Sequence, residues 1–115
     1  MAYRIETARK TIVIATDREP GHPELDPLFV RFCRGADTLI YDAQYTPEEL
    51  ARRRGWGHGS WRDAVDTARD AGVPDLILTH LDRLRSDDDQ DRLVAAAHRE
   101  YPGARGATEH MTLSL

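Results

Sequence analysis

Residues 38–42 read TLIYD, a short run of apolar, β-branched and aromatic residues that ends in a carboxylate. Such a run predicts a buried strand. Two other short apolar runs are followed in the same way by a polar side chain, Asp17 in one case and His80 in the other. If the three strands run in the same direction, Asp17, Asp42 and His80 converge on one edge of the sheet, where open α/β folds bind their ligands.

The rest of the sequence predicts the elements around these strands. Strands are expected at residues 3–6, 11–15, 38–41 and 75–79, the first two as a hairpin, and residues 105–107 and 111–115 are expected to give one or two closing strands. Helices are expected at residues 28–33, 46–53, 61–71 and 86–101. Thr46, Pro47 and Glu49 have the spacing of a capping box with proline in the first turn, and Ser60 and Ser86 are the caps of the two later helices. This order predicts an α/β fold, a mixed sheet with helices on one face.

The composition indicates one soluble domain spanning residues 1–115, because 40% of the residues are hydrophobic, 31% are charged and the net charge is −4. The single cysteine, Cys33, has no partner for an internal disulfide, which fits a reducing cytoplasm. No stretch approaches the roughly 18 apolar residues that span a bilayer, so no membrane partner is expected. The basic residues are scattered apart from residues 52–54, which argues against extended nucleic-acid binding but allows a small phosphorylated ligand.

The most informative loop is GWGHGSW at residues 55–61, with three glycines and two tryptophans in seven residues. It contains His58, and His22 follows Asp17 on another loop. Together with the residues at the strand ends, these imidazoles form a candidate site for zinc, manganese or iron. From spacing alone an equally good interpretation is structural: the aspartates cap turns, His80 is hydrogen-bonded at a strand end, and the tryptophans fill the core.

Six sequence segments, in this order along the chain, favour the metal-site interpretation over the structural one. They read YRIE at 3–6, ATDREP at 15–20, GAD at 35–37 with IYDAQYT at 40–46, GWGH at 55–58 with SW at 60–61, LILTH at 76–80, and MTL at 111–113. With these motifs the chain resembles the second half of the metallo-β-lactamase-fold phosphodiesterases, the group of tRNA 3′-processing endonucleases and bacterial cyclic-nucleotide phosphodiesterases. The resemblance implies half of an αββα sandwich.

The resemblance also implies a role for each matching residue. Asp17 corresponds to the aspartate that bridges two metal ions, and His80 to the last histidine ligand of the second ion. Asp42 and His58 resemble the acid and histidine pair beside the metals, in which the carboxylate orients the imidazole and the imidazole gives a proton to the departing oxygen. His22, on the loop after Asp17, is a further candidate metal ligand.

Several departures accompany the resemblance. The HxHxDH signature of the family belongs to the first half of the fold and does not occur in this chain. Gly59 stands where the family tends to have serine, Leu81 where a second histidine is common, Arg83 in place of proline, and His110 where glycine is usual. Most of the usual metal ligands are therefore missing.

A lone half of a sandwich is expected to expose an apolar sheet face, assigned here to Ile12, Ile14, Leu39 and Ile77, and a homodimer would cover it. Two protomers would also double the number of metal ligands. We therefore expect a homodimeric, metal-dependent phosphodiesterase that uses zinc or manganese on small phosphodiesters, with cyclic nucleotides as the substrates that the resemblance implies. Two alternatives stay open: an inactive fragment of the fold, or an interaction subunit that needs a separate chain carrying the HxHxDH half.

Overall fold

A computed structural model describes residues 2–79, 85–108 and 110–113. Within them five strands form one sheet in the order β1-β2-β3-β4-β5. The strands are β1 (Ala2–Glu6), β2 (Thr11–Ala15), β3 (Thr38–Asp42), β4 (Asp75–Thr79) and β5 (Ala104–Gly106). β1 is antiparallel to β2, and the other neighbours are parallel. The predicted mixed sheet is confirmed, and β2, β3 and β4 end at the same edge.

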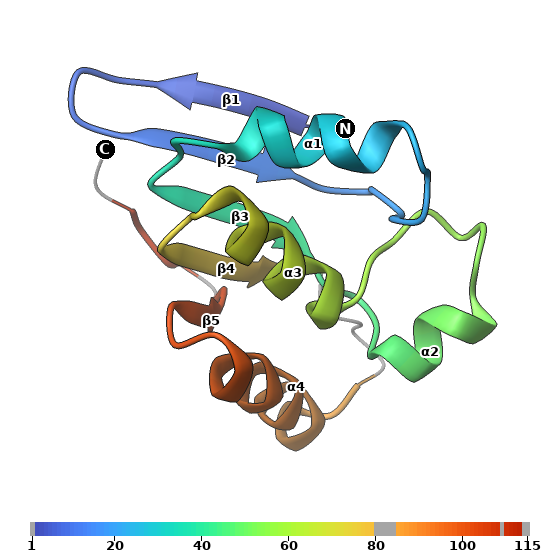
Figure 1. Cartoon of the computed structure of the whole chain (residues 1–115). Coiled ribbons are helices and arrows are strands. Elements are labelled where there is room, and N and C mark those ends of the chain that lie inside the picture. The colour runs from blue at the N-terminus through green and yellow to red at the C-terminus, as the bar shows by residue number, and fades with distance from the viewer. Residues whose placement is uncertain (1, 80–84, 109, 114–115) are drawn as a thin grey trace.

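Four helices accompany the sheet: α1 (Leu25–Cys33), α2 (Pro47–Arg52), α3 (Trp61–Ala71) and α4 (Asp87–Glu100). α1, α3 and α4 cover one face of the sheet, and α2 lies beyond the ends of β3 and β4 (Figure 1). The predicted caps are confirmed, because Thr46 and Ser60 each form a capping box and the Ser86 side chain accepts the N–H of Asp89. In the described part of the chain the helices lie on one face, as the sequence predicted, and no described helix covers the other face.

The predicted start of the first helix was wrong. α1 begins at Leu25 and not at Leu28, because Pro27 lies in the first turn, where its missing N–H has no intrahelical partner to lose. Of the one or two closing strands expected, β5 forms at Ala104–Gly106, whereas residues 111–113 form no strand and residues 114–115 lie outside the described part of the chain.

The core lies between the sheet and the helices. It contains alternate residues of the three central strands, namely Val13, Ala15, Leu39, Tyr41, Leu76 and Leu78, packed against α1, α3 and α4. Leu39, which we expected on the uncovered face, belongs to this core with no exposed surface. In a strand that is apolar throughout, residue type does not reveal which face a side chain takes, and the register settles it by pairing Leu39 with Val13 and Leu76.

The accessible apolar surface on the sheet face without helices, here called the uncovered face, is smaller than expected. Ile12 and Ile77 are 5% and 1% exposed, so the accessible apolar surface consists of Tyr3 and Ile5 on β1, which are 56% and 43% exposed, with half-buried Ile14 and Ile40 beside them. In the register Ile5 pairs with Ile12 and Tyr3 with Ile14, which places both β1 residues on this face. Among the described residues, no helix is long and apolar enough to cross a membrane.

Candidate metal-binding and acid–base site

Asp42 is the centre of a polar cluster at the carboxyl ends of β2 and β3. It is the last residue of β3 and has no exposed surface. Its Oδ2 accepts the backbone N–H of Asp17 at 2.9 Å and lies 2.7 Å from Nδ1 of His58, and its Oδ1 accepts the backbone N–H of Gln44 at 3.3 Å. A buried carboxylate with this many donors orients its neighbours.

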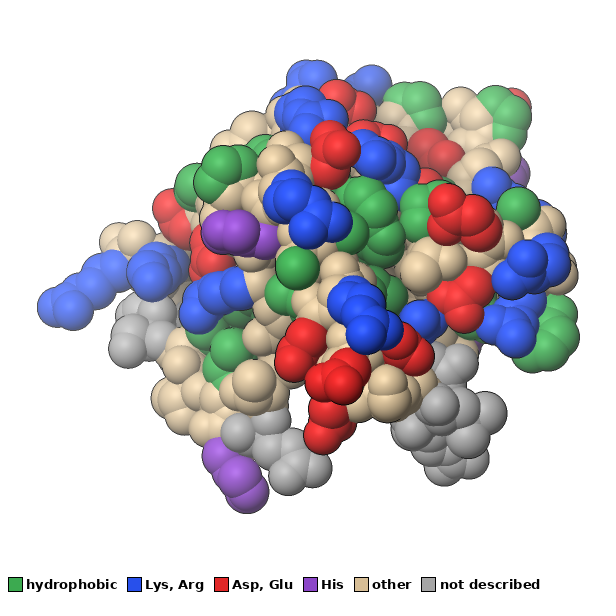
Figure 2. Space-filling model, turned by 90° about the horizontal axis from the view of Figure 1, so that it is seen from below, with side chains coloured by type: hydrophobic (Ala, Val, Ile, Leu, Met, Phe, Trp, Pro, Cys, Tyr) green, Lys and Arg blue, Asp and Glu red, His purple; other side chains and the backbone are tan. Residues whose placement is uncertain are grey.

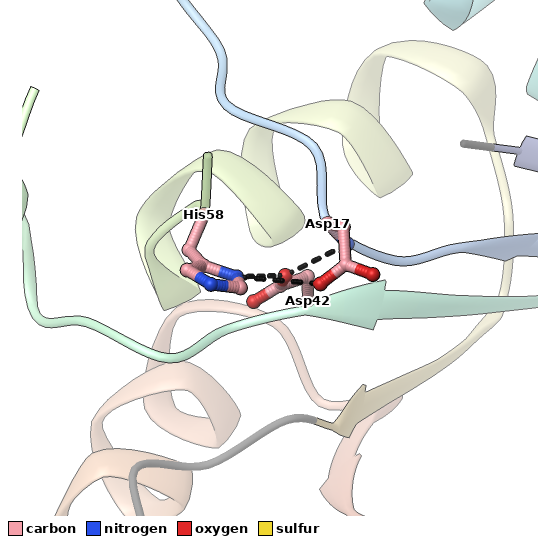
Figure 3. Close-up of side chains that lie close together, drawn as sticks. All are labelled: Asp17, Asp42 and His58. Atoms are coloured by element: carbon pink, nitrogen blue, oxygen red, sulfur yellow. Dashed lines mark hydrogen bonds and ion pairs between the residues drawn. The ribbon is translucent and has the colours of Figure 1, made fainter. Parts of the chain in front are cut away.

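Asp17 follows β2 and presents its carboxylate outward. The side chain is 65% exposed, and its Oδ1 lies 3.7 Å from Nδ1 of His58. The backbone at Asp17 has φ of 52°, a left-handed conformation that costs a non-glycine residue energy. The hydrogen bond from its N–H to the buried Asp42 holds the chain in this turn, so the strained backbone fixes the carboxylate at the sheet edge (Figure 3).

His58 reaches the cluster from the glycine-rich loop. Gly55 and Gly57 have φ of 91° and 87°, which glycine adopts without strain. A Cβ at Gly59 would lie 3.1 Å from the backbone oxygen of Asp42, so the loop passes very close to the end of β3. The Tyr45 ring meets the His58 imidazole edge-on, with ring centroids 6.0 Å apart. The imidazole is thereby held between Tyr45 and the two aspartates.

Hydrogen bonds join this loop to the loop after β2. The backbone N–H of Gly55 donates to Oε1 of Glu19 at 2.6 Å, and the Arg54 guanidinium donates to the carbonyl of Pro20 at 2.9 Å. These contacts join residues 36 and 34 positions apart. Glu19 and Arg54 thus position the segments that carry Asp17 and His58, and sequence reasoning missed them because no local pattern predicts which loops meet.

Arg18, the residue after Asp17, makes a second set of contacts that position the segment. The guanidinium of Arg18 donates to the hydroxyl of Tyr41 at 3.1 Å, pairs with Asp26 and lies 4.1 Å from the centroid of the Phe29 ring. Burial raises the pKa of Tyr41 far above its ordinary value, and the charge of Arg18 offsets only part of this effect. Tyr41 therefore stays a neutral phenol at any physiological pH.

Glu49 and Arg85 form an ion pair on the α2 side of the site. Arg85 also donates to the carbonyl of Gln44 at 3.3 Å. Burial alone would raise the pKa of Glu49, but the hydrogen bond from the Thr46 backbone and the hydrogen bond and charge of Arg85 outweigh it, and the pKa is lowered. The carboxylate that completes the α2 capping box therefore also fixes Arg85 next to the segment that follows Asp42.

The structure brings together three of the five residues that the sequence singled out. Asp17, Asp42 and His58 offer ligand atoms within 4.8 Å of one another. His22 is not brought into this group; its Nδ1 accepts the backbone N–H groups of Glu24 and Leu25 at the start of α1. His80 directly follows β4 but lies outside the described residues.

The two tryptophans of the loop have different environments. Trp61 is 9% exposed and packs in the core, as the structural interpretation required, whereas Trp56 is 67% exposed. Trp56 therefore does not fill the core. His110, which stands where glycine is usual in the family, is exposed with φ of 62° and is not part of the Asp42 cluster.

Comparison with known proteins identifies the class of fold. A family model described as beta-lactamase superfamily domain matches residues 1–81. The metallo-beta-lactamase fold protein YhfI from Bacillus subtilis superposes with a TM-score of 0.68 at 25% identity, over 89% of this chain and 38% of that one. The short form of human tRNase Z superposes with a TM-score of 0.61 at 22% identity, over 72% of this chain and 31% of that one.

The chain belongs to the beta-lactamase superfamily, and its fold is a fragment of the metallo-beta-lactamase fold. Among curated relatives, ribonuclease Z of Brevibacillus brevis is 33% identical over 112 residues, which is 92% of this chain and 33% of that protein. The chain thus spans about a third of the length of the relatives it matches.

The donors at the site fit a divalent metal in part. Asp17 offers an exposed carboxylate at a fixed position, and the imidazole of His58 lies beside it. The oxygens of Asp42 accept hydrogen bonds from the backbone and from His58, which suits a residue that supports a ligand better than a ligand itself. If Asp42 has that supporting role, Asp17 and His58 leave at least one of the three protein ligands of a typical catalytic zinc site to another residue.

Proposed function

We propose that this chain is part of a metal-dependent phosphodiesterase and that it works as a homodimer. The observation that supports the proposal best is the arrangement in which buried Asp42 holds the imidazole of His58 beside the exposed carboxylate of Asp17. This pairs a proton donor with a candidate metal ligand at one sheet edge.

Each residue has a distinct task in this proposal. Asp42 accepts from Nδ1 of His58 and so fixes the tautomer and the direction of the ring. His58, when protonated, gives a proton to the departing oxygen of the phosphodiester. Asp17, with His80 and His22 as further candidates, holds the cation. A bound divalent cation, zinc or manganese, supplies a polarising charge at a phosphoryl oxygen and an activated water.

Two classes of phosphodiester are candidate substrates. The sequence motifs resemble those of cyclic-nucleotide phosphodiesterases, which favours small cyclic nucleotides. Several relatives of this chain are named ribonuclease Z, and a structural neighbour is a tRNase, which favours RNA. On the face seen in Figure 2, acidic and basic side chains are interspersed, and this mixed charge favours a small substrate or a short single strand over a long duplex.

The apolar surface of the sheet supports the proposed homodimer. Tyr3, Ile5, Ile14 and Ile40 form an accessible apolar surface on the face that carries no helix. In a two-fold dimer each copy would cover this surface on the other and bring a second set of Asp17, His58 and His80. The buried thiol of the single cysteine, Cys33, fits a cytoplasmic location.

The test combines metal content with turnover. Purified wild-type protein is analysed for zinc and manganese and is assayed on bis(p-nitrophenyl) phosphate and cyclic AMP, in parallel with Asp17→Ala and His80→Ala. We expect stoichiometric metal and metal-dependent turnover in the wild type, and loss of both in the variants. Metal-free, inactive wild-type dimers would support the inactive-fragment alternative. Activity that appears only when a chain with the HxHxDH half is added would support the interaction-subunit alternative.

A further inference from the structure

Trp56 is the most exposed large hydrophobic residue among those described, and the proposed chemistry does not use it. It lies two residues before His58 in the glycine-rich loop. Because two residues span at most about 7 Å, its backbone is close to that of the histidine. The proposed chemistry therefore gives no reason for an exposed indole so close to His58.

The position of the indole is determined by its neighbours. The backbone N–H of Trp56 donates to the carbonyl of Arg53 at 3.2 Å, and the Arg53 guanidinium lies 5.6 Å from the centroid of the Trp56 ring. The same guanidinium lies 5.5 Å from the centroid of the Tyr45 ring, which meets the imidazole of His58 edge-on. Arg53 and the Tyr45 ring therefore form a chain of contacts from the Trp56 indole to the imidazole of His58, the proposed proton donor.

Arg53 is itself oriented, because its guanidinium lies 3.8 Å from Glu49, the carboxylate paired with Arg85. A positive charge is therefore fixed beside an indole that is 67% exposed, and Arg52 and Arg54 flank it in sequence. On the side of the molecule where α2 lies, Figure 2 shows basic and hydrophobic side chains next to one another. An aromatic surface next to fixed positive charge matches a nucleotide, whose base stacks while its phosphate meets the cation.

We propose that Trp56 is a stacking platform for a nucleobase of the substrate, adjacent to the phosphodiester that His58 would serve. The inference rests on the proposed function for the identity of the substrate, but the stacking contact requires no metal and no turnover. It makes the loop a determinant of specificity: a phosphodiester with a base binds more tightly than one without.

The experiment measures binding in EDTA, where metal-dependent turnover is excluded. Octa-adenylate and an abasic ribose-phosphate octamer of equal charge are titrated against wild type, Trp56→Ala, Trp56→Phe and, as a control for an exposed aromatic outside the loop and the proposed dimer surface, Phe32→Ala at the C-terminal end of α1. We expect Trp56→Ala to bind octa-adenylate at least about 5-fold more weakly and to bind the abasic octamer as the wild type does. Trp56→Phe should retain most of the affinity, and Phe32→Ala all of it.

Equal affinity of the wild type for both octamers, or an unchanged affinity in Trp56→Ala, would overturn the inference. A fall in the mass of Trp56→Ala by light scattering, without a change in binding, would assign the indole to a protein interface instead. Base-dependent binding could also be found in a wild-type protein that does not hydrolyse bis(p-nitrophenyl) phosphate with added metal. That result would support the stacking site and contradict the proposed function.

Discussion

The Asp42 oxygen that lies 2.7 Å from Nδ1 of His58 is the same oxygen that accepts the backbone N–H of Asp17. One buried atom therefore fixes the turn after β2 and the imidazole from the glycine-rich loop. Because a carboxylate can only accept, this contact requires the hydrogen on Nδ1, and in the proposed function Nε2 is the atom of His58 that would exchange a proton with a substrate.

Replacing Asp42 by asparagine tests this arrangement. An amide matches the carboxylate in shape, but it lacks the charge that stabilises a protonated imidazole and can present an N–H where His58 needs an acceptor. We predict that Asp42→Asn lowers turnover on bis(p-nitrophenyl) phosphate by about 100-fold or more, with metal content close to wild type. Steady-state kinetics and metal analysis of the same preparation provide the check.

Asp37→Asn is a matched control at a residue just before the start of β3. Asp37 is exposed and accepts the backbone N–H of Thr11 at 2.8 Å, at the end of the strand opposite the site. The control should lose about 1 kcal/mol of stability and keep its turnover. An equal loss of turnover in both variants would mean that Asp42 acts only by stabilising the fold.

The pair of Glu49 and Arg85 predicts a dependence of stability on pH. The pKa of Glu49 is lowered in the folded protein, so the stabilisation is present above the ordinary value of 4.5 and is lost as the pH falls through the folded-state pKa. Glu49→Gln keeps the capping box and removes the charge. We predict that this variant is about 1–3 kcal/mol less stable than wild type at pH 7.

Urea unfolding at pH 7, 5 and 3.5 checks both the size and the sign of this effect. The difference between wild type and Glu49→Gln should be unchanged from pH 7 to 5 and should shrink below pH 4.5, as the wild-type carboxylate takes up a proton. A difference that stays constant down to pH 3.5 contradicts the assignment of the ion pair as the cause.

Local patterns account for the parts of the fold that the sequence predicted. The strands follow from apolar runs, and the caps at Thr46, Ser60 and Ser86 follow from side chains that bond to backbone three residues on. The meeting of Asp17 and Asp42 follows from parallel strands that end together. Each of these depends on neighbours in sequence or on a general rule of sheet topology.

The parts that the sequence did not predict depend on contacts between distant segments. The hydrogen bonds of Glu19 with Gly55 and of Arg54 with Pro20 join two loops that carry no complementary pattern. His22 was expected at the site from its distance to Asp17, but an imidazole next to a helix start is equally suited to accept the free N–H groups there, as it does in α1. We predicted the pairing of the His58 and Asp42 side chains from the family resemblance, because the spacing of the residues alone does not predict which side chains meet.

Cys33 provides a prediction about chemical reactivity. The thiol has no exposed surface, and burial raises its pKa from 9.0 to about 11. At pH 8 this reduces the thiolate fraction about 100-fold, so we predict that the native protein reacts with Ellman's reagent at least that much more slowly than the protein in urea. A native rate equal to the unfolded rate would show that α1 opens readily.

The proposed homodimer predicts that a charge on the uncovered sheet face separates the subunits. Ile5 is 43% exposed on this face, so Ile5→Lys costs little within one subunit but would bury a charge in the dimer. Leu28→Lys, at a residue 51% exposed on the helical side, is the matched control. By light scattering we expect wild type and Leu28→Lys at about twice 13.0 kDa and Ile5→Lys near the monomer mass. Three equal masses would speak against this interface.

Crystals grown with zinc and measured at its absorption edge test the proposed site most directly. We predict an anomalous peak within about 2.2 Å of a carboxylate oxygen of Asp17, in a dimer whose second subunit or further residues complete the ligands. Crystals with ordered Asp17 and His58 and no zinc peak at this sheet edge would contradict the proposal that the edge is a metal centre.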